Sequence, residues 1–291
     1  MRFVLPAALL LLASPTWAQT EWADTTDTRR PPLFLLEDAD SKVYLFGSIH
    51  VVPASSLPLP RAIESAFDEV EVVAFELDLD AAEAESSALA HKGINGVSVA
   101  EALTEDQMKR LDGTLGRLGV PTGAVDTFEP WLVALMLTTF DLQKRGEMAE
   151  GGVDRYLFDR AQALGREIIP FETAALQTDV FDGMKLKDQV AYLMSTLDGM
   201  DSGEDGYAKL LDTWSSGDDD GLATLMADGT RDTPSLEARL LTDRNRAWVP
   251  QVEALLARDQ DAMVVVGAGH LVGDNSVVAM LRAAGYEVVR Q

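Results

Sequence analysis

Residues 43–50 read VYLFGSIH and residues 263–270 read MVVVGAGH. Each segment is a short apolar run, mostly of β-branched or aromatic residues, that ends in glycine, which is typical of a buried strand leading into a tight turn. In both segments a histidine follows that glycine by three residues. Ligands of open α/β sheets bind in the crevice beyond the strand ends, so we expect His50 and His270 to converge on one site.

A single Gly-x-x-His segment is a weak signal, because a histidine there is often an ordinary polar residue satisfied by a neighbour. Two matched copies in matched settings favour a shared functional site, since the chain has only three histidines. The glycines support this interpretation because they let a ligand or metal approach the backbone closely. The third histidine, His91, lies in a polar stretch and is interpreted as a surface residue.

The remaining apolar patterns predict a sheet surrounded by helices. Two runs at 33–36 and 43–46, separated by a polar segment, predict a β-hairpin. Further strands are expected at 71–78, 167–172, 263–266 and 286–289, and Pro170 suggests an edge position for its strand. Spacings of three and four residues predict helices at 60–68, 98–118, 130–145, 152–164, 186–197, 206–214, 235–258 and 275–284. The sequence therefore indicates an α/β fold with a central mixed β-sheet flanked by helices and a helical middle region.

The two ends of the chain share an order of features. Residues 43–78 and residues 263–289 both read as strand, Gly-x-x-His, turn, helix and strand. We interpret this as a weak internal repeat whose halves pair in one sheet about a pseudo-twofold axis. Residues 33–291 are then expected to form a single α/β domain with a helical insert at about 98–258, after a flexible leader at 19–32.

Composition narrows the classes of protein and of site. The 47% hydrophobic content suits one large core. Because the chain has no cysteine, disulfides, thiolate metal sites and cysteine nucleophiles are excluded, and any metal must be held by His, Asp, Glu or water. The formal net charge of −24 argues against a nucleic-acid partner, since phosphate binding needs clustered Lys and Arg. The acidic run at 218–220 is interpreted as a solvated turn, with weak calcium binding as the alternative.

Residues 1–18 are predicted to be a secretory signal peptide. Arg2 precedes an apolar run at 3–13, and the residues after it predict cleavage following Ala18. The run is short for a membrane span, and no later stretch approaches the roughly 18 apolar residues that a span needs. We therefore expect a bacterial protein that is periplasmic or secreted, with no stable membrane span after cleavage. An uncleaved membrane anchor is the alternative.

Several short motifs, spread over nearly the whole chain, resemble those of the TraB/GumN family. They are LFGSIHVVP at 45–53, FELD at 75–78, FET at 171–173, RN at 244–245, VGAGHLVG at 266–273 and GY at 285–286. The wider superfamily includes Tiki-type metalloproteases, erythromycin esterases and haem-binding ChaN proteins. The resemblance implies an α/β fold and a site built from both histidines and a glutamate at the end of an intervening strand.

Carried over to this chain, that site comprises His50, Glu76 and His270 as metal ligands. Two neutral imidazoles and one carboxylate can hold a divalent ion such as Mn²⁺, Co²⁺ or Zn²⁺ and leave positions open for water and substrate. The resemblance adds Glu172 and Arg244 as supporting or substrate-binding groups, and Glu172 could then act as a general base.

The acidic and basic members of this set also have plainer interpretations. A Glu-x-Asp at a strand end, as at residues 76–78, is often a solvated terminus. Arg244 lies in a charge-rich helical segment, where an exposed ion pair is the usual outcome. Asp154 is interpreted as a helix start with a favourable N-terminal charge, and a role in the site is the alternative.

The leading hypothesis is a secreted metal-dependent hydrolase that acts on a peptide or a small ester. The alternative is a non-catalytic protein of the same superfamily that binds haem or a peptide. A third interpretation, a catalytically inactive scaffold, is weakened because both histidines and Glu76 are present.

Overall fold

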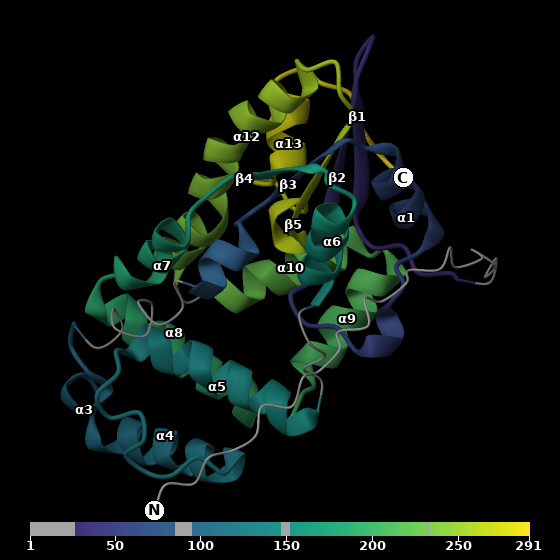
Figure 1. Ribbon diagram of the computed structural model, residues 1–291. Helices are drawn as coiled ribbons and strands as arrows, with labels where there is room; N and C mark the ends of the chain where they lie inside the picture. Colours follow the sequence, from purple (N-terminus) through teal and green to yellow (C-terminus); the bar gives the residue numbers. More distant parts are fainter. Residues whose placement is uncertain (1–26, 85–94, 147–151, 232) are drawn as a thin grey trace, which may run out of the picture.

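The computed structural model describes residues 27–84, 95–146, 152–231 and 233–291 (Figure 1). The expected signal peptide at 1–18, most of the expected leader and His91 lie outside the described residues. Across the described ranges, no helix is both long enough and apolar enough to cross a membrane.

Six strands form one mixed sheet in the order β4-β3-β5-β2-β1-β6. The strands are β1 (Leu33–Glu37), β2 (Lys42–Ser48), β3 (Val72–Phe75), β4 (Glu167–Pro170), β5 (Ala262–Gly267) and β6 (Val288–Arg290). The predicted hairpin is confirmed, because β1 and β2 pair antiparallel with Leu36 opposite Val43. The strand that carries Pro170 is an edge strand, as expected from a residue that lacks a backbone N–H. The α/β fold class is thus confirmed.

The two Gly-x-x-His segments leave the sheet side by side. β2 and β5 are parallel neighbours, and Ser48 lies opposite Gly267 at their carboxyl ends. A side chain at Gly47 would put its Cβ 3.0 Å from the Cα of Ala268, so the close approach of the two turns favours glycine there. Trp214 Nε1 donates a hydrogen bond to the Gly47 carbonyl at 2.8 Å and fixes the turn from the other side. The pseudo-twofold relation between the two ends stays a prediction.

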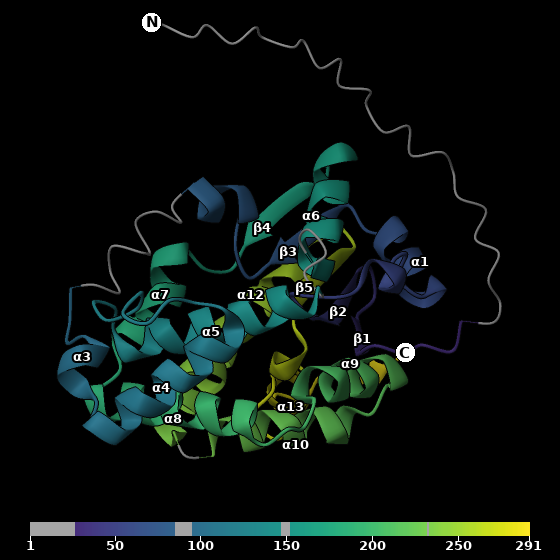
Figure 2. The same cartoon turned by 90° about the horizontal axis from the view of Figure 1, so that it is seen from below.

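Helices cover both faces of the sheet (Figures 1 and 2). Because side chains alternate along a strand, Phe46 and Phe75 pack on one face, and Leu45 and Val264 pack on the other. The first face is covered by α1 (Arg61–Glu69) and α6 (Gly152–Ala163). The second face is covered by α12 (Asp243–Leu256) and α13 (Val277–Ala283). The two apolar layers therefore fix the positions of the strand ends relative to one another.

A second helical group lies beyond the carboxyl edge of the sheet (Figure 1). It contains α3 (Val99–Ala102), α4 (Glu105–Leu118), α5 (Pro130–Arg145) and α8 (Leu186–Asp201). Its own apolar core includes Leu111, Val133 and Leu193, all fully buried. The helix starts follow local signals, since Thr104 caps α4 in a capping box with Gln107.

The remaining helical elements connect these layers. They are η1 (Ala54–Ser56), α7 (Ala174–Asp182), α9 (Gly206–Ser216), α10 (Asp219–Thr230), α11 (Pro234–Glu237), η2 (Ala238–Thr242) and η3 (Ala268–His270).

Some element predictions require correction. The helices α7 and α10 are absent from the prediction, and the strand expected at 71–78 ends at Phe75, so that Glu76 follows the strand. The acidic run at 218–220 is not a solvated turn, because Asp218 caps α10 by accepting the Gly221 N–H and Asp219 pairs with Arg290. Acidic residues in the first turn of a helix are favourable, because the N-terminal end of the helix dipole is positive.

Candidate active site

The expected site residues come from the carboxyl ends of adjacent strands. His50 follows β2, Glu76 follows β3, and His270 ends the η3 turn after β5. Glu172 follows β4, and its N–H donates to the Glu76 carbonyl at 2.9 Å, so the pairing of β3 and β4 continues past the strand ends. Arg244 reaches the site from the first turn of α12.

Arg244 lies at the centre of the contacts. Its Nη2 is 2.6 Å from Glu76 Oε2 and 2.9 Å from Glu172 Oε2, and its Nε is 3.0 Å from Glu172 Oε1. Its Nη1 is 3.1 Å from His270 Nε2. The side chain is only 10% exposed, so the plainer interpretation of Arg244 as part of an exposed ion pair is wrong. A planar guanidinium can make several such bonds at once, which an ammonium cannot.

His270 is held by Asn245. Asn245 Oδ1 lies 2.6 Å from His270 Nδ1, an arrangement in which Nδ1–H donates and the Nε2 lone pair faces the other site residues. The imidazole packs on Trp248 with ring centroids 4.3 Å apart. Burial lowers the pKa of His270 to about 3, so this imidazole is neutral at pH 7.

His50 has the opposite electrostatic environment. Its Nδ1 lies 3.0 Å from Asp154 Oδ2, and the other oxygen of Asp154 accepts a 2.6 Å hydrogen bond from Ser48 Oγ. Attraction to the Asp154 carboxylate raises the pKa of His50. Because 72% of the His50 side chain is exposed, water screens part of this attraction. Asp154 therefore combines the expected helix start with a direct contact to the site.

Glu76 is held as a carboxylate. Its Oε1 accepts the Gly267 N–H at 2.7 Å, and its Oε2 accepts Gln177 Nε2 at 2.9 Å in addition to Arg244. Burial alone would raise the pKa of Glu76, but attraction to His270 and Arg244 brings it down to about 2. The buried carboxylate is consequently ionised at neutral pH.

Glu172 is also fully engaged. Both of its oxygens accept bonds from Arg244, and Oε1 also accepts Trp248 Nε1 at 2.9 Å. The side chain is only 8% exposed. These contacts leave Glu172 suited to holding Arg244 in place.

The donor chemistry of this group suits a divalent cation. In both histidines Nδ1 is bound to a side-chain oxygen, which orients the ring and leaves Nε2 as the nitrogen that could coordinate, an arrangement that also occurs in metal centres whose imidazoles are fixed by outer partners. His270 Nε2 lies 3.8 Å from Glu76 Oε1, close enough for both atoms to share one ion. In the described part of the chain, however, no three His, Asp or Glu side chains are gathered closely enough to hold a metal ion. The Arg244 guanidinium contacts both Glu76 and His270 instead.

Four contributing residues were missed in the sequence. Ser48 lies inside a Gly-x-x-His segment, and Asn245 belongs to the Arg-Asn pair, so both had a local signal. Trp248 lies four residues after Arg244 and therefore on the same helix face, which only a helix-wheel argument could have shown. Gln177 lies on α7, which was not predicted.

The fold and the site define a class of α/β protein in which parallel strand ends bring two histidines, two glutamates and an arginine to one edge of the sheet. A family model described as the TraB/PrgY/gumN family matches residues 32–290. This chain therefore belongs to that family, and the resemblance seen in its motifs is confirmed.

Individual relatives are distant. The uncharacterized protein YbaP of Escherichia coli (strain K12) is 24% identical over 240 residues, which cover 82% of this chain and 87% of YbaP. Metalloprotease TIKI2 of Danio rerio is 26% identical over a region that covers 84% of this chain and 57% of TIKI2. The chain thus spans somewhat more than half the length of TIKI2.

Proposed function

We propose that this chain is a metal-dependent hydrolase that cleaves a peptide or ester bond. The observation that carries the proposal is the meeting of two Gly-x-x-His turns at adjacent ends of β2 and β5, with Glu76 directly after the neighbouring strand β3. Both imidazoles have Nδ1 fixed by a side-chain oxygen, so that Nε2 is the ring nitrogen that would coordinate an ion. The likeness to a protein named as a metalloprotease supports the same chemistry.

The charge of the site favours a cation. Three carboxylates, those of Glu76, Asp154 and Glu172, lie with the single guanidinium of Arg244, so the site has excess negative charge when both imidazoles are neutral. His50, Glu76 and His270 would hold the ion, for which we propose Mn²⁺, Co²⁺ or Zn²⁺. When bound, it would supply a water molecule of lowered pKa and polarise the scissile carbonyl.

The other residues of the site orient these groups. Asn245 fixes the His270 tautomer, and Asp154 with Ser48 fixes the ring of His50. Arg244 Nη1 contacts His270 Nε2, so it would have to move away if that atom held an ion, and its N–H would then be available to a substrate oxygen. Because both Glu172 oxygens are occupied, we assign it to positioning Arg244 in preference to a role as general base.

The test combines metal titration with a hydrolysis screen. Isothermal titration with Mn²⁺, Co²⁺ and Zn²⁺ is performed on the wild type and on His50→Ala, His270→Ala and Glu76→Gln, beside panels of peptides and esters. Each histidine variant is expected to lose stoichiometric binding and hydrolysis, while His91→Ala, which removes the third histidine, keeps both. Glu76→Gln retains the size of the side chain but loses its charge, so metal affinity should weaken and hydrolysis should fall by about 10²-fold or more.

Two results would contradict the proposal. One is wild-type protein that binds none of the three ions, and the other is a double histidine variant that hydrolyses as fast as wild type. In either case a spectroscopic titration with haem tests the alternative of a non-catalytic haem-binding protein, which would show a Soret band.

We also propose that residues 33–291 act as one domain with the helical insert at about 98–258, and that the chain is exported after cleavage following Ala18. Mass spectrometry of protein expressed with its own leader should then find a chain that starts at Gln19. Intact Met1 on a detergent-extracted form would support the anchor alternative.

A further inference from the structure

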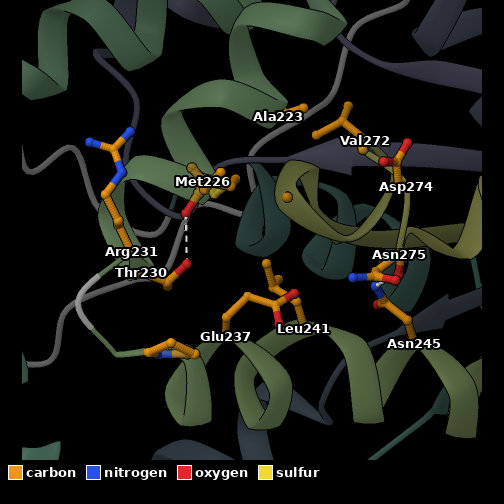
Figure 3. A pocket seen from close by; sticks show the side chains of 14 residues that line it. Ala223, Met226, Thr230, Arg231, Glu237, Leu241, Asn245, Val272, Asp274 and Asn275 are labelled. Atoms are coloured by element: carbon orange, nitrogen blue, oxygen red, sulfur yellow. Dashed lines mark hydrogen bonds between the residues drawn. The ribbon is translucent and has the colours of Figure 1, made fainter.

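A pocket of about 380 Å³ lies on the Asn245 side of His270. Figure 3 shows Met226 and Thr230 on one wall facing Glu237 and Leu241 on the other, with Asn275 at the end. The first wall is α10, and the second is formed by α11 and the η2 turns that lead into α12. The volume is at the lower end of the range of pockets that hold small ligands, so it suits a single long side chain.

The pocket shares residues with the candidate active site. Asn245 lines it and also binds His270 Nδ1. Gly269, the residue before His270, lines it as well, and a Cβ at Gly269 would come within 2.9 Å of Met226 Sδ. A group seated in the pocket is therefore next to the turn that carries His270.

The lining combines apolar and polar side chains, and its charges are not balanced. Met226, Leu241 and Val272 supply apolar surface. Glu237 and Asp274 supply two carboxylates, and among the lining residues that the structure describes Arg231 is the one cation. The Arg231 guanidinium is already bound to Asp228, which lies outside the lining, so its charge is offset locally.

The two carboxylates of the pocket remain available to a cation. Glu237 Oε1 accepts a 2.9 Å hydrogen bond from Thr242 Oγ1, which orients the carboxylate without neutralising it. Asp274 forms no ion pair with any residue that the structure describes. A partly buried carboxylate beside apolar walls gains most from a ligand that carries both an aliphatic stem and a positive tip.

We infer that this pocket binds the side chain of a lysine or arginine residue of the substrate. The aliphatic stem packs between Met226 and Leu241, and the charged tip reaches Glu237. The identification of this ligand as part of a substrate rests on the proposed hydrolase function, whereas binding of the basic side chain does not. The net charge of −24 on the chain also attracts a basic peptide over longer distances.

Binding is tested without turnover, by nuclear magnetic resonance of metal-free protein labelled at the methionine methyl groups. The Met226 signal is assigned by its loss in Met226→Leu. The probes are the N-acetyl amides of lysine, norleucine and glutamate. Lysine and norleucine both have a straight aliphatic side chain but differ in the terminal positive charge, and glutamate carries a negative charge instead. We expect the lysine probe to shift the Met226 signal with a dissociation constant about tenfold below that of norleucine, because only the ammonium group can form a charge-assisted hydrogen bond with Glu237; this factor corresponds to about 1.4 kcal/mol.

Variants identify the groups responsible. Glu237→Gln should remove the preference for lysine over norleucine, and Ala227→Phe should block both probes by filling the pocket. Asp220→Asn removes the same charge from α10 outside the lining and should leave the preference unchanged. The signals of the other methionines report whether each variant is folded.

Equal affinity for the lysine and norleucine probes, or a Met226 signal that no probe shifts, would overturn the inference. The proposed function is tested separately with matched peptides that carry lysine, norleucine or glutamate next to the scissile bond. Lysine binding without hydrolysis of any peptide contradicts the hydrolase proposal and retains the pocket. Equal hydrolysis of the three peptides contradicts the role of the pocket in substrate binding and retains the hydrolase proposal.

Discussion

The two imidazoles of the site differ in what surrounds them. His270 is buried against Trp248 and bound to a neutral amide, whereas His50 is mostly exposed and bound to a carboxylate. Burial disfavours the charged imidazolium, and a neighbouring carboxylate favours it. The same residue type in the same motif therefore has a lowered pKa at one position and a raised pKa at the other.

This difference predicts two distinct titrations. In metal-free protein, the nitrogen resonances of His50 should titrate above pH 6.5, and those of His270 should not titrate between pH 5 and 8. Asp154→Asn should move the His50 midpoint down toward 6.5, because the attraction that raises its pKa is removed. An unchanged midpoint in Asp154→Asn would show that another group sets the pKa of His50.

The same contact links stability to pH. Since the folded protein holds the His50 proton more tightly than the unfolded chain does, the contribution of this pair is fully present below about pH 6.5 and is lost as pH rises through the folded pKa. The free energy of unfolding, measured with urea, should accordingly fall more between pH 6 and pH 9 for the wild type than for Asp154→Asn.

Arg244 tests whether the network needs a guanidinium. Arg244→Lys keeps the charge but cannot bond Glu76, Glu172 and His270 together, so it leaves buried carboxylate oxygens without partners. We expect a loss of about 1–3 kcal/mol in the free energy of unfolding and at least a tenfold loss of hydrolysis. Glu253→Gln, on the same helix, is the control. Wild-type stability and activity in Arg244→Lys would mean that Arg244 contributes only charge.

At the scale of elements, the start of α6 determines where His50 lies. Val153 N–H donates to the Ile49 carbonyl, and a Cβ on Gly152 would lie 1.9 Å from the His50 carbonyl oxygen. Gly152 has φ +56°, a conformation in which other residues are strained. The first turn of α6 is thus in close contact with the backbone of the Gly-x-x-His turn, and Asp154 of the same helix contacts the His50 ring.

Gly152→Ala should therefore damage the site as well as the fold. The methyl group must displace either α6 or the His50 backbone, so we expect a loss of about 2 kcal/mol or more in stability and weaker metal binding. The matched control is Gly199→Ala in α8, where the added methyl meets none of the described residues within 4 Å beyond its chain neighbours and the backbone of its own helix, and which should gain about 0.5–1 kcal/mol. Unfolding by urea and metal titration of both variants provide the comparison. Equal stability of the two would refute the steric argument.

At the scale of the whole molecule, we expect the fold to be stable without an ion in the site. Both faces of the sheet are covered by apolar layers, and the group formed by α3, α4, α5 and α8 has a core of its own. The buried ionic groups of the site are held by one another and by Arg244. Removal of an ion should leave this framework intact.

Chelation should consequently lower the melting temperature without unfolding the protein. An ion present at 100 times its dissociation constant adds about 2.7 kcal/mol, which corresponds to roughly 5–10 °C for a chain of this size. Circular dichroism should show the same helical content with and without EDTA at 25 °C. Loss of helical signal on chelation would indicate that the ion is structural.

The sequence by itself determined the strands, the hairpin and the candidates His50, Glu76, His270, Glu172 and Arg244, in part through the family resemblance. Apart from Arg244, which lies in a charge-rich helical segment, these features are local, because each depends on a short apolar run and the few residues that follow it. The helix α10 escaped prediction because its acidic first turn resembles a solvated loop.

Only the tertiary structure decided which groups hold the candidate residues. Asp154 reaches His50 from 104 positions away along the chain, and Arg244 reaches Glu76 from 168 positions away. Such pairs leave no periodic pattern, since the chain brings them together only when the strands align and α6 and α12 pack on opposite faces of the sheet. The unequal pKa values of two identical motifs follow from the same packing, because burial and neighbouring charge are properties of the folded molecule.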